Sequence, residues 1–307
     1  MLFALFVTGS RVWTPGRGWA VGAASIAPIA LPCYVAMLIA GAVLWSRARI
    51  VAALLLVIGL VGTPLHVAWV LPSFVGDGGD GPVALTVMEA NLHYGLADAA
   101  RVAAIARDER ADVVVLTELT PAEQGRLDAL GFTDRYPHHA GEPRPVRDGT
   151  VVFSRYPLRD IRSLDISRGG VVAEVEAPRP FTIVAAHAGQ PFIAGYGWRD
   201  DIVRLTHDLA PLRGPRLLVG DLNASMDASQ LRTLASHAGL TDAARAAGSG
   251  WQPTWPGAIG SRFWSRLGGA AAIDHVLMSS DFGAVSTSTY VVGGTDHRTL
   301  VARLANR

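Results

Sequence analysis

Polar side chains with catalytic or metal-binding chemistry recur where the apolar runs of this sequence end. They are Asn91, Glu118, His187, Asp221, Asn223, Asp274, Asp296 and His297. Taken singly, an Asp or Asn after a strand is most often a turn residue. Several of them together indicate a site, because the strand ends of an α/β fold aim side chains from a rigid scaffold at one crevice.

The functional groups of this set are carboxylates, amides and imidazoles. Ligands dominated by hard oxygen atoms suit Mg²⁺ or Mn²⁺ rather than zinc. The single cysteine, Cys33, lies in an apolar run and excludes both a disulfide framework and a cysteine-rich zinc site. The sequence therefore predicts a site for Mg²⁺ or, alternatively, Mn²⁺.

Short apolar runs alternate with amphipathic stretches from residue 83 onward, and these elements must position the polar residues. Helices are expected at 98–110, at 120–130 with Thr120 as N-cap and Pro121 at the first position, at 198–212 and at 229–238. Strands are expected at 83–90, 111–117, 150–154, 171–176, 181–186, 216–219, 273–278, 287–292 and 299–304. The pattern predicts one α/β domain over 83–307, with two sheets flanked by helices.

Three motifs carry a resemblance to a known family. They are Gly-Asp-Leu-Asn at 220–223, Ile-Asp-His-Val at 273–276 and Thr-Asp-His-Arg at 295–298, preceded by Asn91, Glu118 and His187. This ordered set resembles the endonuclease/exonuclease/phosphatase superfamily, which includes deoxyribonuclease I, apurinic endonucleases, neutral sphingomyelinases and inositol-polyphosphate phosphatases. The resemblance implies a four-layer α/β sandwich and divalent-metal-dependent cleavage of a phosphate ester.

The resemblance also implies a role for each carboxylate and amide. Glu118 would hold the metal, with Asn91 and Asp296 completing its coordination directly or in an outer layer. The metal would polarise a phosphoryl oxygen and offset charge on the leaving group. Asp221 would align and deprotonate the attacking water, and Asn223 would donate hydrogen bonds to a phosphate oxygen.

The histidines receive different roles from the same resemblance. His297 would clamp the phosphate as a cation, oriented by Asp274, because a carboxylate partner fixes the imidazole tautomer and raises its pKa. His187 would be a second imidazole at the phosphate, paired with Asp148 unless Asp148 is only a turn residue. His275 should point to the opposite face of its strand and be structural, and the pair at 138–139 is interpreted as a loop.

Two further features are candidates for substrate binding. Arg147, with Arg144 and Arg155, could bind phosphates bidentately, or could belong to a solvated loop. Trp255 lies in the tryptophan-rich stretch 251–264, which could be a packed loop, a platform for stacking a base, or a belt that dips into lipid. In the resembling superfamily, loops at this point rim the active site, which makes the stretch a candidate for substrate specificity.

The first 75 residues differ from the rest in charge and hydropathy. They contain none of the 26 acidic residues and only four of the 27 arginines, and the runs 19–45 and 50–75 carry no charge. Two transmembrane helices are expected, at about 19–45 and 50–72, with a possible partial helix at 1–7. Two buried helices of a soluble protein are the alternative, whereas a cleaved signal peptide fits poorly. Residues 76–82 form a Gly/Asp linker.

The arginines also predict an orientation in the membrane. The short turn 46–49 carries two arginines and no acid, and short basic loops stay in the cytoplasm. The domain that follows the second run would then lie outside the cytoplasm. Arg11 and Arg17, which would also lie outside, oppose this prediction.

The substrate class stays open at this level. A nuclease-like phosphodiesterase is the default, but the chain after Val75 has 23 arginines against 26 acids, a net charge of −3, and lacks the basic surface of tight nucleic-acid binders. Membrane attachment favours a lipid phosphodiesterase or phosphatase as the alternative, and a non-catalytic binding domain is a third possibility. The expected partners are the phosphate ester, nucleic acid or a lipid head group, and the lipid bilayer; no protein partner is implied.

Overall fold

Two six-stranded mixed sheets form the centre of the C-terminal domain. The computed structural model describes residues 1–13, 17–79, 81–193, 197–259 and 262–307. The first sheet has the order β11 (Phe282–Val291), β12 (Arg298–Asn306), β1 (Leu85–Asn91), β2 (Val113–Thr117), β4 (Thr150–Ser154), β3 (His138–Glu142). The second has the order β5 (Leu158–Ser163), β6 (Gly170–Val175), β7 (Phe181–Ala186), β8 (Arg216–Asp221), β10 (Asp274–Ser279), β9 (Leu240–Asp242). β1 pairs with β2 and β7 with β8 in parallel, and the other pairs are antiparallel.

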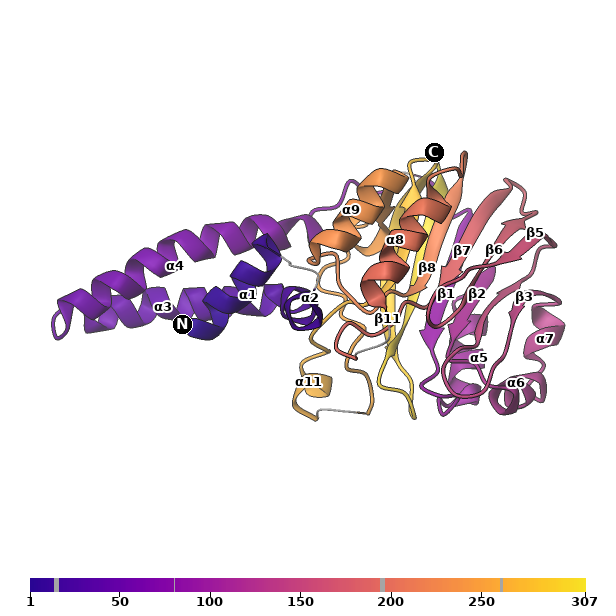
Figure 1. Cartoon of the computed structure of the whole chain (residues 1–307), viewed down its shortest axis with the longest axis horizontal. Helices are drawn as coiled ribbons and strands as arrows, with labels where there is room; N and C mark the ends of the chain where they lie inside the picture. Colours follow the sequence, from indigo (N-terminus) through magenta and orange to yellow (C-terminus); the bar gives the residue numbers. More distant parts are fainter. Residues whose placement is uncertain (14–16, 80, 194–196, 260–261) are drawn as a thin grey trace.

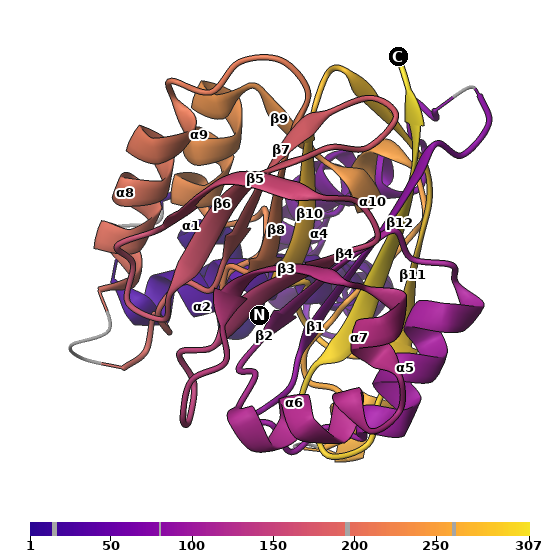
Figure 2. The same ribbon diagram turned by 90° about the vertical axis from the view of Figure 1, so that its right-hand side faces the viewer.

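The sheets pack face to face and helices cover both outer faces, which gives four layers (Figure 2). Successive residues of a strand point to opposite faces, so Leu85 and Val87 join the core between the sheets while Met88 packs under the helices. The first sheet is covered by α5 (Ala99–Asp108), α6 (Pro121–Asp128) and α7 (Phe132–Arg135), and the second by α8 (Trp198–Leu209) and α9 (Ser229–Ala238). The predicted four-layer α/β sandwich is confirmed.

The three strands that the sequence did not predict are β3, β5 and β9. Each lies at the edge of its sheet. An edge strand exposes one side to solvent, so it needs no apolar run, and β5 has a single partly buried residue followed by five exposed ones. The prediction that 138–139 is a loop was therefore wrong, because both histidines begin β3. The short helices α10 (Ala243–Ala246) and α11 (Arg262–Arg266) were also missed.

The N-terminal segment is helical but more divided than expected. It contains α1 (Leu2–Val12), α2 (Gly18–Ser25), a 3₁₀ turn at Ala27–Ile29, α3 (Ala30–Leu44), α4 (Arg49–Val70) and a second 3₁₀ turn at Leu71–Ser73. The expected single helix at 19–45 is broken after Ser25, because Pro28 has no N–H to donate and disfavours helical geometry in the residue before it. The partial helix expected at 1–7 extends to Val12.

An α3–α4 hairpin projects from one side of the domain (Figure 1). The segments Ala27–Leu44 and Arg49–Ser73 are long and apolar enough to cross a membrane, by length and composition only. A core helix of a soluble protein or a signal sequence would pass the same test. Only 28% and 22% of their most apolar windows are buried, so most of this apolar surface faces outward.

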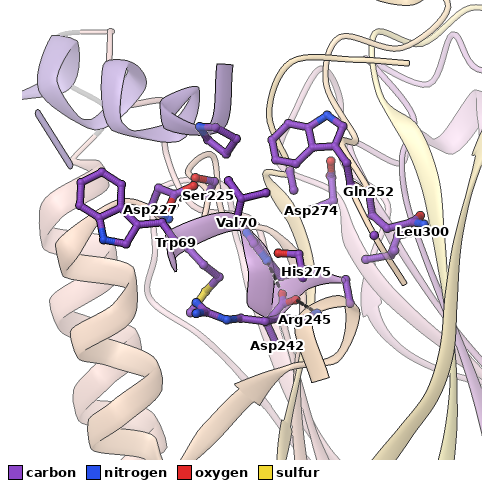
Figure 3. A pocket seen from close by; sticks show the side chains of 17 residues that line it. Trp69, Val70, Ser225, Asp227, Asp242, Arg245, Gln252, Asp274, His275 and Leu300 are labelled. Carbon is purple, nitrogen blue, oxygen red and sulfur yellow. Dashed lines mark hydrogen bonds and ion pairs between the residues drawn. The ribbon is translucent and has the colours of Figure 1, made fainter. Parts of the chain in front are cut away.

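The N-terminal segment is docked on the domain and not merely joined to it by the linker. Arg11 Nε lies 2.5 Å from Asp227 Oδ1, and the backbone N–H of Ser225 donates to Ser25 Oγ at 3.0 Å. Val21 of α2 belongs to the core under α8 and α9. Figure 3 shows a small cavity, about 80 Å³, between the end of α4 near Trp69 and the residues of the domain. The two regions therefore share one interface.

Candidate active site

Six polar side chains converge at one end of the two sheets because of how the strands pair. Asn91 ends β1 and Asp221 ends β8, while Asp274 begins β10. β10 runs antiparallel to β8, so Asp274 lies directly opposite Asp221 in the register. Glu118 and His187 follow β2 and β7, and His297 precedes β12. Since β12 runs antiparallel to β1, its beginning meets the end of β1, and Thr295 Oγ1 donates to the Asn91 carbonyl at 2.8 Å.

Glycine 220 is required for this convergence. Its φ is +144°, and a Cβ there would lie 2.0 Å from the Ala186 carbonyl oxygen. Only a glycine lets the end of β8 approach the end of β7 so closely. The Gly-Asp pair of the motif thus has a physical reason: the glycine brings the strands together and the following carboxylate, Asp221, points to the shared end.

One carboxylate oxygen, Oδ2 of Asp221, is the point on which three side chains converge. Asn91 Nδ2 donates to it at 2.9 Å, His187 Nε2 lies 3.4 Å away, and His297 Nε2 lies 3.7 Å away. The Asn223 N–H donates to the other oxygen at 2.8 Å. Burial, followed by the charge of Asp274, raises the pKa of Asp221 to about 7, although His297 opposes the rise. A carboxylate with that pKa suits proton transfer near neutral pH.

His297 and Asp274 form the predicted pair. His297 Nδ1 lies 2.9 Å and 3.0 Å from the two Asp274 oxygens. Burial is the largest effect on His297 and acts to lower its pKa, but Asp274 and Asp221 together outweigh it and raise the pKa well above the usual value. Burial, Arg168 and His297 instead lower the pKa of His187. The surroundings therefore favour the charged form of His297 and the neutral form of His187.

Glu118 lies at the neighbouring strand end in a strained conformation. Its φ is +53°, a left-handed value that costs a non-glycine residue about 1–3 kcal/mol and recurs at functional sites. The backbone N–H of Tyr94 donates to its Oε2 at 2.7 Å. Burial raises the pKa of Glu118 to about 7 against the opposing effect of His297 and Arg168. Burial is thus the main cause of the raised pKa of Glu118.

Asp296 completes the group from the turn before β12. Its Oδ1 lies 2.7 Å from His93 Nδ1, and Trp255 Nε1 donates to its Oδ2 at 3.3 Å. Its negative charge also acts to raise the pKa of Glu118. Trp255, predicted as a specificity residue, therefore lies against the catalytic cluster, with 39% of its surface exposed.

The balance of charge at this end of the sheets fits a bound cation. Asp221, Asp274 and His297 each bring one atom to within 4.8 Å of the others, and with His297 protonated the two carboxylates remain as ligands for a cation. Glu89 of β1 adds a further carboxylate that is fully buried, and neither of its oxygens accepts a hydrogen bond from a described donor. Burial, Asp274 and Asp221 raise its pKa well above the usual value. A divalent cation would stabilise the ionised forms of these groups.

Sequence reasoning missed Glu89, His93 and Arg168. Glu89 occurs two residues before Asn91 in a strand where every residue is buried, so period-two alternation places both on the same face, and that signal was available. His93 follows Asn91 and donates its backbone N–H to Asn91 Oδ1 at 2.9 Å. Arg168 is 1% exposed and its positive charge lowers the pKa of both His187 and Glu118; its loop position gives no sequence signal.

The structure does not form the predicted Asp148–His187 pair and does not place Arg155 at the site, but it does place Arg147 there. Nδ1 of His187 has no hydrogen-bond partner among the described residues, so the predicted Asp148–His187 pair is not formed; Asp148 lines a separate hollow beside β4. Arg155 pairs with Asp112 at 3.1 Å, at the opposite end of β2 from Glu118, because β4 runs antiparallel to β2. Arg147 does lie at the site, with its guanidinium 4.4 Å from the Tyr94 ring centroid.

Asn223 and His275 point in different directions. Asn223 has a φ of +52° and donates Nδ2 to the Ala188 carbonyl at 2.9 Å, on the wall of the cavity beside His297. His275 faces away from the cluster, as predicted: its Nδ1 lies 2.9 Å from Asp242 Oδ2 and its Nε2 lies 2.9 Å from the Ala224 carbonyl.

Comparison with protein families agrees with this geometry. Residues 88–297 match the model of the Endonuclease/Exonuclease/phosphatase family, and this range holds every residue of the cluster. The chain belongs to this family. The nucleases and phosphatases that give the family its name are hydrolases of phosphoesters. Among curated proteins, no sequence matches this chain significantly.

Solved structures of the family share the fold of the domain. An endonuclease/exonuclease/phosphatase from Beutenbergia cavernae is 23% identical, with a TM-score of 0.55 over 73% of this chain and 72% of its own. Sphingomyelinase C from Streptomyces griseocarneus is 18% identical, with a TM-score of 0.54 over 73% and 99%. The 3′ phosphatase NExo from Neisseria, bound to a product DNA hairpin, is 17% identical, with a TM-score of 0.58 over 72% and 100%. At these identities the likeness establishes the fold alone.

Proposed function

We propose that the domain hydrolyses a phosphodiester with the help of a divalent metal ion. The observation that carries this proposal is the convergence of Asn91, His187 and His297 on one oxygen of Asp221. Asp221 takes a proton from water as the water oxygen bonds to phosphorus. The phosphorus–oxygen bond to the leaving group then breaks, and the departing oxygen takes up a proton from solvent. The products are a phosphomonoester and an alcohol.

His297 and His187 divide the binding of the phosphate between them. His297 is cationic because Asp274 holds its Nδ1, so its Nε2 can donate to a phosphate oxygen as negative charge develops. His187 is neutral and fully buried. Asn223 lies at the same wall and offers an amide to the phosphate. The buried guanidinium of Arg168 lowers the local cost of bringing in an anion.

Mg²⁺ or Mn²⁺ is the cofactor that the donor set suits best. Glu118 would hold it, with Asp296 beside it and Asn91 between Glu118 and Asp221. When bound, the ion would withdraw electron density from a phosphoryl oxygen and stabilise the leaving group. Both Asn91 groups are engaged within the protein, Oδ1 by His93 N–H and Nδ2 by Asp221, which favours an orienting role for Asn91 beside the ion.

The α3–α4 hairpin is proposed to anchor the domain in a membrane, with the domain outside the cytoplasm. The turn 46–49, at the end of the hairpin away from the domain (Figure 1), carries Arg47 and Arg49, and short basic turns stay in the cytoplasm. Arg11 and Arg17 oppose this orientation by count; Arg11 is paired with Asp227 at 2.5 Å and so is held against the domain. Reporter fusions at Arg307 that are active only inside or only outside the cytoplasm test this: a signal from the cytoplasmic reporter would reverse the topology.

Two substrate classes are candidates for the domain: nucleic acid, which is bound to the structurally similar NExo, and a lipid phosphodiester, suggested by the similar fold of sphingomyelinase C. A non-catalytic binding domain is disfavoured because every position of the catalytic motif is occupied. Hydrolysis of bis-nitrophenyl phosphate by the full chain in detergent tests for an enzyme independently of substrate class. We expect turnover with Mg²⁺ or Mn²⁺ and none after chelation. Full turnover after exhaustive EDTA treatment would refute the metal-dependent mechanism.

A further inference from the structure

A cavity of about 480 Å³ separates the first helices of the chain from the catalytic cluster. It lies between α2 and the ends of the strands, in contact with the loop that follows β7 and the segment that precedes β10. Its volume is within the ~300–1,000 Å³ of ordinary small-molecule sites. A molecule bound there would contact both the N-terminal segment and the catalytic residues.

The two ends of this cavity differ in chemistry. Asn223, Asp296 and His297 form a polar end that belongs to the catalytic cluster. The remaining wall is largely apolar and includes Phe192 and Ile26, the residue that follows α2. None of the described residues that line the cavity is an arginine. The cavity thus suits a molecule with a phosphate at one end and an apolar group at the other.

Exposed apolar side chains occur in the cavity wall and on a neighbouring loop in sequence. Phe192 is 68% exposed, and on the loop that continues from Trp255, Phe263 and Leu267 are also largely exposed. α2 and α11 lie on the side of the domain from which the α3–α4 hairpin projects (Figure 1). α11 carries Phe263, so exposed apolar side chains occur on the side of the domain that bears the hairpin.

We propose that the substrate is a membrane lipid phosphodiester, whose hydrocarbon part enters this cavity while its phosphate reaches the catalytic cluster. The inference rests on the proposed hydrolase function and names its substrate class. The helix that forms one wall of the cavity, α2, leads directly into the hairpin, so the apolar end of the cavity faces the region where a bilayer would lie. The N-terminal segment would then both anchor the chain in the membrane and form one wall of the substrate cavity.

Nucleic acid fits these observations less well. A nucleic-acid backbone needs a track of basic side chains, whereas none of the described residues that line the cavity is an arginine and the chain after Val75 carries a net charge of −3. Trp255 could stack on a base, but its indole N–H is engaged by Asp296. Preference for nucleic acid is therefore an outcome that the test must be able to detect.

The test is a series of nitrophenyl phosphodiesters whose second alcohol is methyl, butyl, hexyl or octyl, used as monomers with the full chain in detergent. Burial of one methylene contributes about fourfold in affinity, the equivalent of ~0.8 kcal/mol. We expect kcat/KM to rise at least tenfold from methyl to octyl. A flat series, or faster cleavage of single-stranded DNA than of the octyl diester and of phosphatidylcholine vesicles, would overturn the lipid inference while leaving the hydrolase function intact.

Variants of the cavity wall sharpen the test. Phe192→Ser and Ile26→Ser should each lower the octyl-to-methyl ratio of kcat/KM at least threefold. Leu130→Ser is the matched control, because Leu130 is exposed to a similar degree, 51%, but lies at the end of α6 on the other sheet. An unchanged ratio in both wall variants would contradict the inference.

If the protein does not hydrolyse phosphodiesters, a binding experiment still tests the cavity. If no diester is cleaved with Mg²⁺ or Mn²⁺, binding of methyl-, butyl- and octylphosphonate is measured by calorimetry with the same proteins. Affinity that rises with chain length and falls in Phe192→Ser supports a site for an apolar tail in a non-hydrolytic protein. Affinity that is independent of chain length refutes the tail site as well.

Discussion

The α3–α4 hairpin and the β-sandwich differ in how much of their large apolar side chains they expose. In α4, Ile50, Leu60 and Val61 are 79%, 64% and 65% exposed, whereas all seven residues of β1 are buried. Polar groups lie inside the helical segment: Thr8 Oγ1 contacts Tyr34 OH at 2.6 Å and His66 Nε2 at 2.9 Å. Apolar residues outside and polar residues inside are the arrangement expected in lipid.

Both regions therefore contain buried polar groups, but only those of the sandwich carry an excess of charge. The Thr8, Tyr34 and His66 cluster consists of two hydroxyls and an imidazole that meet at Thr8 Oγ1, while His66 Nδ1 has no partner among the described residues. The cluster at the strand ends brings several carboxylates together around Asp221. A neutral buried network can stabilise a fold, whereas buried like charges are destabilising unless a ligand offsets them. This difference is the basis for proposing a structural role for one cluster and a catalytic role for the other.

Removal of one polar group from each cluster should separate these roles most clearly. Asp221→Asn should lower kcat by roughly 10²–10⁴, because it removes the group that accepts the proton of water. His66→Gln should lower kcat less than threefold, since His66 touches only the helical segment. Both are measured with bis-nitrophenyl phosphate on protein whose circular dichroism matches that of the parent. An equal loss in the two variants would mean that the helical cluster takes part in catalysis.

The metal should stabilise the sandwich through its excess of negative charge. At a concentration 100 times its Kd, Mg²⁺ or Mn²⁺ should add about 2.7 kcal/mol to the free energy of unfolding, because only the folded state has the site. Thermal denaturation with and without the ion measures this as a rise in Tm. Glu118→Gln should lose most of the rise. Glu142→Gln, an exposed carboxylate on edge strand β3, is the control that should keep it.

Much of the fold was predictable because burial leaves a pattern in the sequence. All nine predicted strands exist, and Asp98 and Thr120 cap α5 and α6 with their side chains. The edge strands were not predicted because water hydrogen-bonds to the backbone groups on their outer side, so their sequences need no apolar run. The division of the first apolar run at Pro28 was also missed, because proline is tolerated in membrane helices and its effect depends on what packs around it.

The site was predictable where a motif and a strand end coincide, and unpredictable where contact is made through loops. Asp274 and His297 are 23 residues apart, yet their motifs placed them together and they pair at 2.9 Å. Arg168 reaches the same cluster from the β5–β6 connection. That loop lies near Glu118 only because the two sheets pack face to face. The false prediction for Asp148 has the same origin: neighbourhood in sequence to a strand does not determine which side of the loop faces His187.

The junction between the two regions should show measurable coupling. Arg11 and Asp227 have side chains that are 10% and 18% exposed, so their ion pair is shielded from water and salt. A double-mutant cycle with Arg11→Gln and Asp227→Asn should give a coupling free energy of about 1–2 kcal/mol by chemical denaturation in detergent. Arg159 and Glu176 form a pair within the sandwich that is 69% and 35% exposed, and their cycle should give less than about 0.5 kcal/mol. Equal values would mean that the segment is tethered to the domain without a specific contact.

The smallest effect is expected at His275, the histidine that the sandwich uses for structure. Burial is the largest effect and acts to lower the pKa of His275, but the hydrogen bond to Asp242 and the charge of that carboxylate outweigh it, and the net shift is upward. A group whose pKa is raised on folding contributes stability that is fully present below its unfolded pKa, ~6.5, and is lost as the pH rises through the folded value. His275→Gln should therefore cost roughly 1 kcal/mol at pH 5.5 and less at pH 9. Unfolding followed by tryptophan fluorescence at the two pH values measures the difference, with Asp242→Asn expected to show the same trend. A cost for His275→Gln that grows with pH would show that His275 is neutral in the folded protein, and that Asp242 does not hold its proton.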